Sequence, residues 1–326
     1  MMRRVGIIGA GQAGVHHATA ITASRRASVA WVADPVQARG EALAERCRSR
    51  YVPDYRTALA DAEAACICVP HANLAEVAVE VACAGVHLLL EKPMATTLAD
   101  ADRVIGAARE HAVILMVGFV HRFRPEATEA RRLIVAGAIG RPVLITDHGF
   151  GGGQDAWPAW VQQARSGGGL LLYSGVHRFD RVRWLLAREV IAVRGTVAAL
   201  LPGSDVDSSY GALLDLEDHR RAVLTHHYHA IPAPHTWETE IHGLDGLIRI
   251  RTGEGLEVFT REGIRRVSSG PDRRFEAQLE AFLDAIDGAR DPLSSGADGR
   301  AALAIALAVA RAHTTGETVA LSPPHQ

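Results

Sequence analysis

The chain has 326 residues, of which 48% are hydrophobic and 22% charged, a composition typical of a globular enzyme large enough for two cores. Its formal net charge of −2 gives no electrostatic reason to expect a nucleic-acid or anionic-membrane partner. The longest late apolar run, residues 301–310, falls well short of the ~20 residues that a membrane span needs, and we expect a cytoplasmic protein.

The first 120 residues alternate short apolar runs with helical patterns. Strands are predicted at 4–9, 28–33, 64–69, 86–90 and 113–118, and helices near 13–23, 36–46, 72–84 and 97–110. This alternation predicts an α/β domain over residues 1–120, with a doubly wound parallel sheet and right-handed crossovers.

A glycine-rich motif, Gly-x-Gly-x-x-Gly, directly follows the first predicted strand. In such a motif the first glycine permits the tight turn, the second admits a pyrophosphate, and the third allows the helix to pack closely on the strand. Asp34 ends the second strand, where its carboxylate can accept hydrogen bonds from both ribose hydroxyls of NAD. Arg39 follows closely, so NADP stays open as an alternative. The residues expected to contact the cofactor here are Gly9, Gly11, Gln12, Ala13, Gly14 and Asp34.

The pattern changes after Phe119. Helices are predicted near 125–136, 175–186, 273–288 and 297–313, and strands at 141–149, 190–201, 208–216, 220–230, 235–242, 246–251 and 256–260. Successive strands with short turns predict an α+β domain over residues 121–326, built on a large, open, mostly antiparallel sheet. We expect this domain to bind substrate and, through an exposed apolar sheet face, to form a homodimer or homotetramer.

Histidines and cysteines do not form a convincing metal site. The four cysteines are Cys47, Cys66, Cys68 and Cys83, and their spacing fits neither a redox motif nor a zinc site, so we interpret them as reduced core thiols. His227 and His229 share one face of a predicted strand and His226 the other, with His235 further along. No carboxylate or cysteine stands at ligand spacing beside them. We therefore predict no metal, and a role in lining the substrate pocket or an oligomer interface.

Several motifs in order along nearly the whole chain resemble the Gfo/Idh/MocA family, the glucose–fructose oxidoreductase and inositol dehydrogenase group. Besides the glycine motif, they are residues 84–93 (Ala-Gly-Val-His-Leu-Leu-Leu-Glu-Lys-Pro), 117–119, 137–142, 167–169, 175–177 and 275–279. The resemblance implies a Rossmann domain followed by an α+β domain with a large open sheet. It also implies an NAD(P)-dependent oxidoreductase.

The resemblance further implies two catalytic centres. Lys92 of Glu-Lys-Pro matches the lysine between nicotinamide and substrate, where its amine polarises a carbonyl or stabilises an alkoxide. Glu91 is expected to position the backbone or the cofactor, or to be structural, and Pro93 to shape the turn. His177 matches the family's acid–base histidine, which takes the hydroxyl proton as hydride leaves the same carbon.

Tyr173 stands where the family usually has aspartate. Residues 173 and 177 are spaced to share a helical face, so the phenol can orient His177, donate to a substrate oxygen or transfer a proton itself. Altered or reduced chemistry is the other reading. We favour a functional tyrosine.

Further residues match family regions near the cofactor or substrate. Pro70 and His71 follow the third predicted strand, and we expect both to contact the cofactor, with lining of the substrate entrance as the alternative for His71. The family often has Asn or Thr where His71 stands. Arg122 is predicted to bind substrate or cofactor, with a structural salt bridge as the alternative. Trp157 and Trp160 precede the glycine triplet, and we expect Trp160 in particular to offer its indole face to a sugar.

Together these observations predict transfer of a hydride between NAD(P) and a carbinol carbon of a sugar, polyol or sugar derivative. An alternative is a closed redox cycle, in which the enzyme oxidises a glycoside, eliminates a substituent and reduces the product again. A second alternative is a non-catalytic sugar or dinucleotide sensor, which the missing aspartate at position 173 keeps open.

Overall fold

The computed structural model describes residues 2–153 and 157–322. The chain divides into two compact units. The N-terminal unit comprises Met1–Val120 and Arg273–Arg300, and the C-terminal unit comprises His121–Asp272 and Ala301–Gln326. The predicted division at residue 120 therefore misses a return of the chain, because residues 273–300 pack with the first unit. Phe275, on this returning segment, stacks on His16 with ring centroids 4.7 Å apart.

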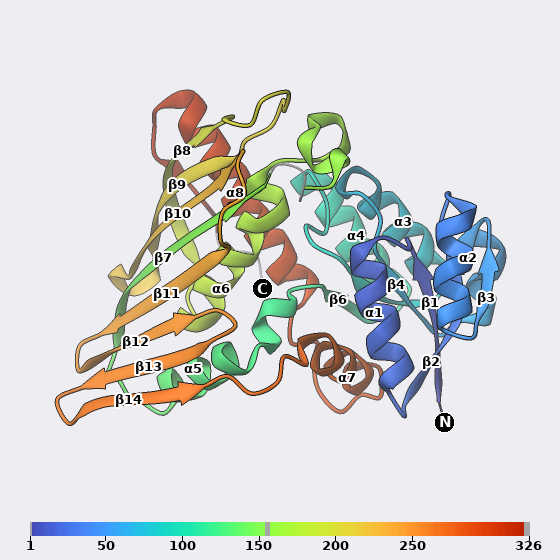
Figure 1. Ribbon diagram of the computed structural model, residues 1–326, viewed down its shortest axis with the longest axis horizontal. Coiled ribbons are helices and arrows are strands. Elements are labelled where there is room, and N and C mark those ends of the chain that lie inside the picture. Colours follow the sequence, from blue (N-terminus) through green and yellow to red (C-terminus); the bar gives the residue numbers. More distant parts are fainter. Residues whose placement is uncertain (1, 154–156, 323–326) are drawn as a thin grey trace. The chain divides into compact units, whose positions relative to one another are not determined.

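The N-terminal unit is a parallel six-stranded Rossmann sheet with strand order β3-β2-β1-β4-β5-β6 (Figure 1). Its strands are β1 (Arg3–Ile8), β2 (Ala27–Ala33), β3 (Arg50–Val52), β4 (Ala64–Ile67), β5 (His87–Leu90) and β6 (Leu115–Val117). Its helices are α1 (Gln12–Ala23), α2 (Gln37–Arg46), α3 (His71–Cys83), α4 (Leu98–Glu110) and α7 (Arg274–Ile286). The order reverses between β1 and β4, and in such sheets dinucleotides bind at the carboxyl ends of these strands.

These strands appear in the sequence as apolar runs because their side chains are buried. Val5 and Ile7 of β1 and the whole of β4 are buried, as expected for parallel strands covered on both faces. β3 is the element that the sequence analysis did not predict. It is three residues long, and only Val52 is buried, so it carries no apolar pattern.

The C-terminal unit is built on a nine-stranded sheet with order β14-β13-β12-β11-β7-β10-β9-β8-β15. Its strands are β7 (Pro142–Gly152), β8 (Val190–Ala198), β9 (Ser209–Leu216), β10 (Arg221–His229), β11 (Thr236–Gly243), β12 (Gly246–Arg251), β13 (Gly255–Thr260), β14 (Gly263–Ser268) and β15 (Val319–Ala320). The pairs are antiparallel except for β7 with β10. The mostly antiparallel sheet is confirmed, and the parallel pair, β14 and β15 are additions to the prediction.

The two faces of this sheet differ in burial. Ile145, Ala222 and Leu224 are fully buried on one face, whereas Phe150 and Val223 on the other are each 43% exposed. The unit's longer helices are α5 (Pro125–Val135) and α6 (Val176–Leu186), and α8 (Gly296–Thr315) begins in the N-terminal unit and continues into this one.

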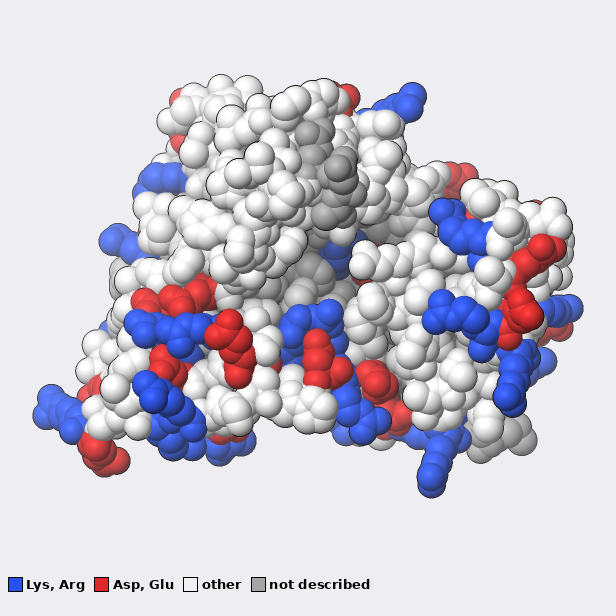
Figure 2. All heavy atoms as spheres, viewed as in Figure 1, with Lys and Arg blue, Asp and Glu red and all other residues white. Residues whose placement is uncertain are grey.

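Charged residues are mixed rather than segregated on the face that Figure 2 draws, where acidic side chains lie among the arginines. Within the described residues, no helix is both long and apolar enough to cross a membrane.

Candidate functional site

The glycine motif forms a turn in which each glycine has a distinct steric role. Gly9 has a positive φ of +97°, and a Cβ there would lie 2.4 Å from the carbonyl oxygen of Cys68. A Cβ on Gly14 would lie 1.9 Å from the Gly9 carbonyl oxygen. Gly11 differs, because a Cβ there would meet nothing within 4 Å. Gly11 caps the N-terminus of α1, so this open space lies beside free backbone N–H groups and fits a pyrophosphate.

Asp34 braces this turn from the end of β2. Its carboxylate is 2% exposed and accepts hydrogen bonds from the backbone N–H of Ala10 at 2.7 Å and of Val36 at 2.8 Å. Arg39 donates to the same carboxylate through Nε at 3.1 Å and Nη2 at 2.8 Å. The structure thus places Asp34 beside the glycine turn, where the sequence predicts it, and adds an arginine partner.

Pro70 and His71 lie at the carboxyl end of β4, next to β1 in the sheet. Pro70 caps the N-terminus of α3, and His71 is the first residue of that helix and is 3% exposed. Both therefore lie, like the glycine turn, at the carboxyl ends of the parallel strands. Their contact with the cofactor stays a prediction.

Glu91 points toward α1. Its Oε1 lies 2.9 Å from Nε2 of His17, and both side chains are buried, with 11% and 1% exposure. Its Oε2 accepts a long hydrogen bond from the backbone N–H of Lys92 at 3.3 Å. A Cβ on Gly118 would lie 3.0 Å from Glu91 Cδ, so the glycine makes room for the carboxylate. These contacts fit the interpretation that Glu91 positions the local backbone.

His17 is a residue that the sequence analysis missed. The available signal was its place three residues after Gly14, on the helix that follows the turn. Its ring also packs edge-on against Phe275, with centroids 5.3 Å apart. The His17–Glu91 pair joins α1 to the end of β5, directly before Lys92.

Lys92 is the only lysine in the sequence, since the other 34 of its 35 basic side chains are arginines. Burial lowers the pKa of Lys92, and the neighbouring Glu91 carboxylate opposes that shift. Burial alone would raise the pKa of Glu91, but the His17 hydrogen bond and nearby positive charges outweigh burial and lower it. Glu91 is thus an ionised partner that sustains the ammonium form of Lys92.

Tyr173 and His177 lie on one continuous helical stretch of the C-terminal unit. Tyr173 is in a π-helical turn, Leu171–Gly175, and His177 is the second residue of α6, which follows at once. Such π-helical turns occur frequently at functional sites. The Asp207 carboxylate accepts a hydrogen bond from the backbone N–H of Leu171 at 2.8 Å and so anchors the start of this stretch.

His121 contacts His177 and was not predicted as a site residue. The two rings are nearly perpendicular, at 86°, with centroids 4.5 Å apart. Nδ1 of His121 accepts a hydrogen bond from Nε of Arg124 at 3.0 Å. His121 also contacts Trp237, with ring centroids 4.8 Å apart. The available signal for His121 was its place next to Arg122, a predicted site residue. That position does not indicate the contact of His121 with His177.

Trp237 is itself held by a buried polar network centred on Asp147. That carboxylate accepts hydrogen bonds from Trp237 Nε1 at 2.7 Å, Thr239 Oγ1 at 2.6 Å and Arg178 Nη1 at 2.5 Å. The Arg181 guanidinium lies 3.7 Å from the centre of the Trp237 ring, and burial lowers its pKa to about 10. Packing and hydrogen bonds thus hold the Trp237 side chain, which contacts His121, in place.

Arg122 forms two hydrogen bonds to Asp180, from Nε at 2.8 Å and Nη2 at 2.5 Å, and both side chains are buried. This geometry fits the structural salt-bridge alternative, because two guanidinium nitrogens are engaged by the carboxylate. Substrate binding by Arg122 stays a prediction that these contacts do not favour.

Aromatic side chains surround Tyr173. Trp160 lies edge-on to it with centroids 6.2 Å apart, and Trp157 lies 6.1 Å from it. Trp157 also packs on Tyr228 at 4.7 Å. The Tyr228 hydroxyl is 3.3 Å from Nε2 of His235. We call Trp157, Trp160, Tyr173 and Tyr228 the aromatic group. Trp160 is partly exposed, whereas Trp157 is buried.

The histidines of β10 alternate between the two faces of the strand, as predicted. His226 is buried beside Tyr210, whereas the rings of His227 and His229 contact each other with centroids 4.3 Å apart. Among the described residues, no group of three or more His, Cys, Asp or Glu side chains is placed to hold a metal ion. The prediction of core thiols fits Cys66, which is buried, but is wrong for Cys83, which is exposed on the last turn of α3.

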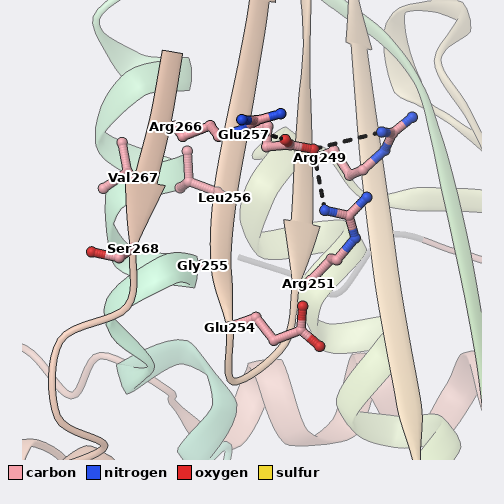
Figure 3. Close-up of a pocket in the computed structure, with 9 residues that line it drawn as sticks. All are labelled: Arg249, Arg251, Glu254, Gly255, Leu256, Glu257, Arg266, Val267 and Ser268. Carbon is pink, nitrogen blue, oxygen red and sulfur yellow. Dashed lines mark hydrogen bonds and ion pairs between the residues drawn. The ribbon is translucent and has the colours of Figure 1, made fainter. Parts of the chain in front are cut away.

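A cavity of about 380 Å³ lies on strands β12–β14 (Figure 3). Glu257 lines it and pairs with Arg266 at 2.9 Å, Arg251 at 3.2 Å and Arg249 at 3.6 Å. None of the predicted site residues lines it. Arg249 and Arg251 also pair with Glu240 and Glu238 of β11, so all three arginines that line the cavity are engaged by carboxylates. We therefore interpret the residues around this cavity as a surface ion-pair network.

Two consecutive parts of the chain match known families. Residues 3–119 match the family described as "Oxidoreductase family, NAD-binding Rossmann fold", and residues 127–249 match the "GFO/IDH/MocA C-terminal domain".

Individual relatives match most of the chain. An inositol 2-dehydrogenase of Rhizobium meliloti (strain 1021) is 29% identical over 95% of this chain and 97% of its own. A 1,5-anhydro-D-fructose reductase of Ensifer adhaerens is 31% identical over 72% of each chain. The solved structure of a levoglucosan dehydrogenase in complex with NADH shares the fold, with a TM-score of 0.92 at 22% identity over 99% of this chain and 100% of its own.

Proposed function

This chain belongs to the Gfo/Idh/MocA family of oxidoreductases, with an NAD-binding Rossmann domain, and from that premise we propose that it transfers a hydride between nicotinamide and a carbinol carbon. The substrate is a sugar, polyol or sugar derivative. Its relatives include an inositol 2-dehydrogenase and a 1,5-anhydro-D-fructose reductase, which supports this class.

Lys92 is the observation that carries the proposal. A chain that uses arginine at every other basic position has no general need of lysine, so this position requires what arginine lacks. A lysine amine is compact and loses its proton when its environment lowers the pKa, whereas a guanidinium stays charged. Burial lowers the pKa of Lys92 in this way. A group that exchanges a proton with a substrate oxygen needs that property.

Each part of the machinery then has a separate task. The open space at Gly11 and the N-terminus of α1 hold the pyrophosphate, and Asp34 lies where the adenosine ribose is expected. Bound nicotinamide supplies the hydride acceptor or donor. Nζ of Lys92 stabilises the developing charge on the substrate oxygen, and the His177 imidazole takes or returns the hydroxyl proton.

Tyr173 assists from the same helical stretch as His177, and Trp160 offers an indole face. Sugars and inositols present apolar C–H faces that pack on aromatic rings, while their hydroxyls need donors and acceptors. The aromatic group supplies such faces around one phenol. The exposed Phe150 and Val223 further support a homodimer or homotetramer formed through the open sheet face, to be measured as molar mass in solution.

The test is reduced-nicotinamide absorbance with the full-length protein, NAD or NADP, and a panel of inositols, sugars, anhydrosugars and glycosides. We expect NADH to accumulate with one class, and Lys92→Arg and His177→Asn to abolish turnover while NADH binding persists. His111→Asn, which changes an exposed histidine at the C-terminal end of α4, is the matched control and should retain activity.

Other outcomes would select the alternatives. Consumption of a glycoside without net NADH would indicate the closed redox cycle. Sugar binding without turnover, unaffected by Lys92→Arg, would indicate a sensor and overturn the proposal.

A further inference from the structure

Asp207 lies on the loop between β8 and β9 and contacts the start of the helical stretch that carries Tyr173 and His177. We propose that Asp207 is a positioning residue: its carboxylate takes the place of a side-chain cap on this stretch and so fixes the positions of Tyr173 and His177. The inference rests on the function proposed above for these two residues, but the cap can also be measured without any turnover.

The helical stretch begins at Leu170 and has no capping side chain of its own. Gly169 precedes it and accepts a hydrogen bond from the N–H of Tyr173 at 2.9 Å, but glycine has no side chain to bind the free N–H groups that follow. Asp207 binds two of these groups instead. Its carbonyl oxygen accepts from the N–H of Leu170 at 2.9 Å, and its Oδ2 accepts from the N–H of Leu171 at 2.8 Å.

Gly169 makes room for this carboxylate. A Cβ at position 169 would lie 2.3 Å from Oδ1 of Asp207, and the backbone there has a positive φ of +103°. The carboxylate therefore occupies the space in which a side chain of residue 169 would lie. A larger residue at this position would displace Asp207 from the start of the helical stretch.

The backbone that carries Asp207 is itself held by the sheet. The N–H of Ser208 donates to the carbonyl oxygen of Ala198 in β8 at 2.9 Å, and the carbonyl oxygen of Ser208 accepts from the N–H of Tyr228 in β10 at 2.9 Å. The Ser208 side chain is fully buried. Asp207 thus connects the start of the helical stretch to two strands of the sheet.

The π-helical turn Leu171–Gly175 lies between this cap and His177. In this turn the N–H of Val176 donates to the carbonyl oxygen of Leu171, one residue further back than in an α-helix. Release of the Leu171 end would let the turn rewind by one residue toward the commoner α-helix, which rotates Tyr173 by about 100° relative to His177. Because a misplacement of about 1 Å can lower a rate about 100-fold, the cap controls whether these side chains meet the substrate correctly.

The burial of Asp207 is a separate indication of function. Burial raises the pKa of Asp207 to about 6, although the backbone N–H groups of Leu171, Asp207 and Leu170 lower it. A carboxylate is therefore kept at a position where burial disfavours its charged form. Ionisable groups with shifted pKa values cluster at functional sites, and this one contacts the stretch that carries two proposed site residues.

The first experiment compares kcat and KM of wild type, Asp207→Ala, Asp207→Val and Asp207→Asn on the substrate found in the panel, per NADH-binding site. The valine variant fills similar space without an acceptor, so it separates the lost hydrogen bond from lost volume and replaces the alanine variant if that does not fold. We expect both to lower kcat about tenfold or more. NADH affinity should persist, because the glycine turn belongs to the N-terminal unit. Asp207→Asn keeps one acceptor oxygen and should retain most of kcat.

Hydrogen exchange measured by mass spectrometry provides a second readout, which needs no substrate. Asp207→Ala should speed exchange at residues 170–177. Asp205→Ala is the matched control, because Asp205 lies on the same loop, is exposed, and accepts a hydrogen bond from the N–H of Ala164 at 2.8 Å. That variant should speed exchange at Ala164–Ser166 rather than at 170–177, and should lower kcat less than Asp207→Ala.

Three results would overturn the inference alone. They are an Asp207→Val variant with wild-type kcat, unchanged exchange at residues 170–177, and an Asp207→Asn variant as slow as Asp207→Val. Equal losses of kcat in Asp207→Ala and Asp205→Ala would assign the effect to the loop as a whole and would also contradict a specific cap. If wild type itself turns over no substrate, the proposed function fails, and the positioning role fails with it even where exchange shows the cap.

Discussion

His121 and His177 contact each other edge to face, with ring centroids 4.5 Å apart. Because Nδ1 of His121 accepts a hydrogen bond from the Arg124 guanidinium, a neutral His121 carries its proton on Nε2. His121, whose tautomer is fixed by this hydrogen bond and whose ring packs against Trp237, therefore helps to position His177. His177 is the residue proposed to exchange the substrate proton. This support comes from a different part of the chain than Tyr173, which occupies the position of the family's usual aspartate.

We expect His121→Ala to lower kcat about tenfold or more, since a small displacement of an acid–base group costs a large share of its effect. KM and NADH affinity should change little, because the substitution leaves binding groups in place. Arg124→Gln removes the donor to Nδ1 and should cause a smaller loss. Steady-state kinetics on the substrate found in the panel checks this. Unchanged kcat in both variants would show that His121 only fills space.

The buried His17–Glu91 pair predicts a loss of stability on breaking it. His17→Leu removes the hydrogen-bond partner of Glu91 Oε1, and breaking a buried pair of this kind typically costs about 3–5 kcal/mol. Urea unfolding of His17→Leu, Glu91→Gln and the double variant measures the coupling between the two residues. A double variant as unstable as the sum of the single variants would contradict the pairing.

Because Lys92 is the only lysine, reductive methylation with ¹³C-formaldehyde labels just this side chain and the N-terminal amine. Burial lowers the pKa of Lys92, so its resonance should titrate at lower pH than that of an exposed lysine in a model peptide. The Glu91 carboxylate raises that pKa, so Glu91→Gln should move the titration to still lower pH. A Lys92 titration that Glu91→Gln leaves unchanged would exclude electrostatic support from Glu91.

Asp207 predicts a pH-dependent stability of opposite sign to that of a typical carboxylate. Burial raises the pKa of Asp207 to about 6 in the folded protein, whereas the unfolded value is about 3.8. Its favourable contribution is complete below pH 3.8 and is lost as pH rises through 6.

The measurement is the difference in unfolding free energy between wild type and Asp207→Asn from pH 4 to 8, which cancels other carboxylates. We expect wild type to lose about 1–3 kcal/mol relative to the variant across this interval. A difference that stays constant with pH would show that Asp207 titrates normally.

Two glycines of the cofactor turn, Gly11 and Gly14, predict different effects of an alanine substitution on stability. A Cβ on Gly14 would meet the backbone at 1.9 Å, so Gly14→Ala should cost about 1–3 kcal/mol of stability and weaken NADH binding. A Cβ on Gly11 meets open space, so Gly11→Ala should fold with unchanged stability yet weaken NADH binding. Thermal unfolding and NADH titration distinguish the two. Normal NADH affinity in Gly11→Ala would place the pyrophosphate elsewhere.

Features that depend on short stretches of chain could be predicted from the sequence. The glycine turn and its strand could be predicted because turn geometry, helix start and apolar strand all lie within residues 3–14. The alternation of strands and helices likewise predicted the parallel sheet, because burial on both faces produces continuous apolar runs. Lys92, His177 and Tyr173 were found through motifs. Their joint role stays a proposal.

Contacts between side chains that are distant in the sequence became visible in the folded chain. Glu91 pairs with His17 across 74 positions of sequence, and Asp147 with Trp237 across 90. Arg122 is engaged by Asp180, and His121 lies against His177. The physical reason is that a buried polar side chain must find a partner in the folded interior. Which partner it meets depends on the path of the chain through the fold, and the local sequence does not specify that path.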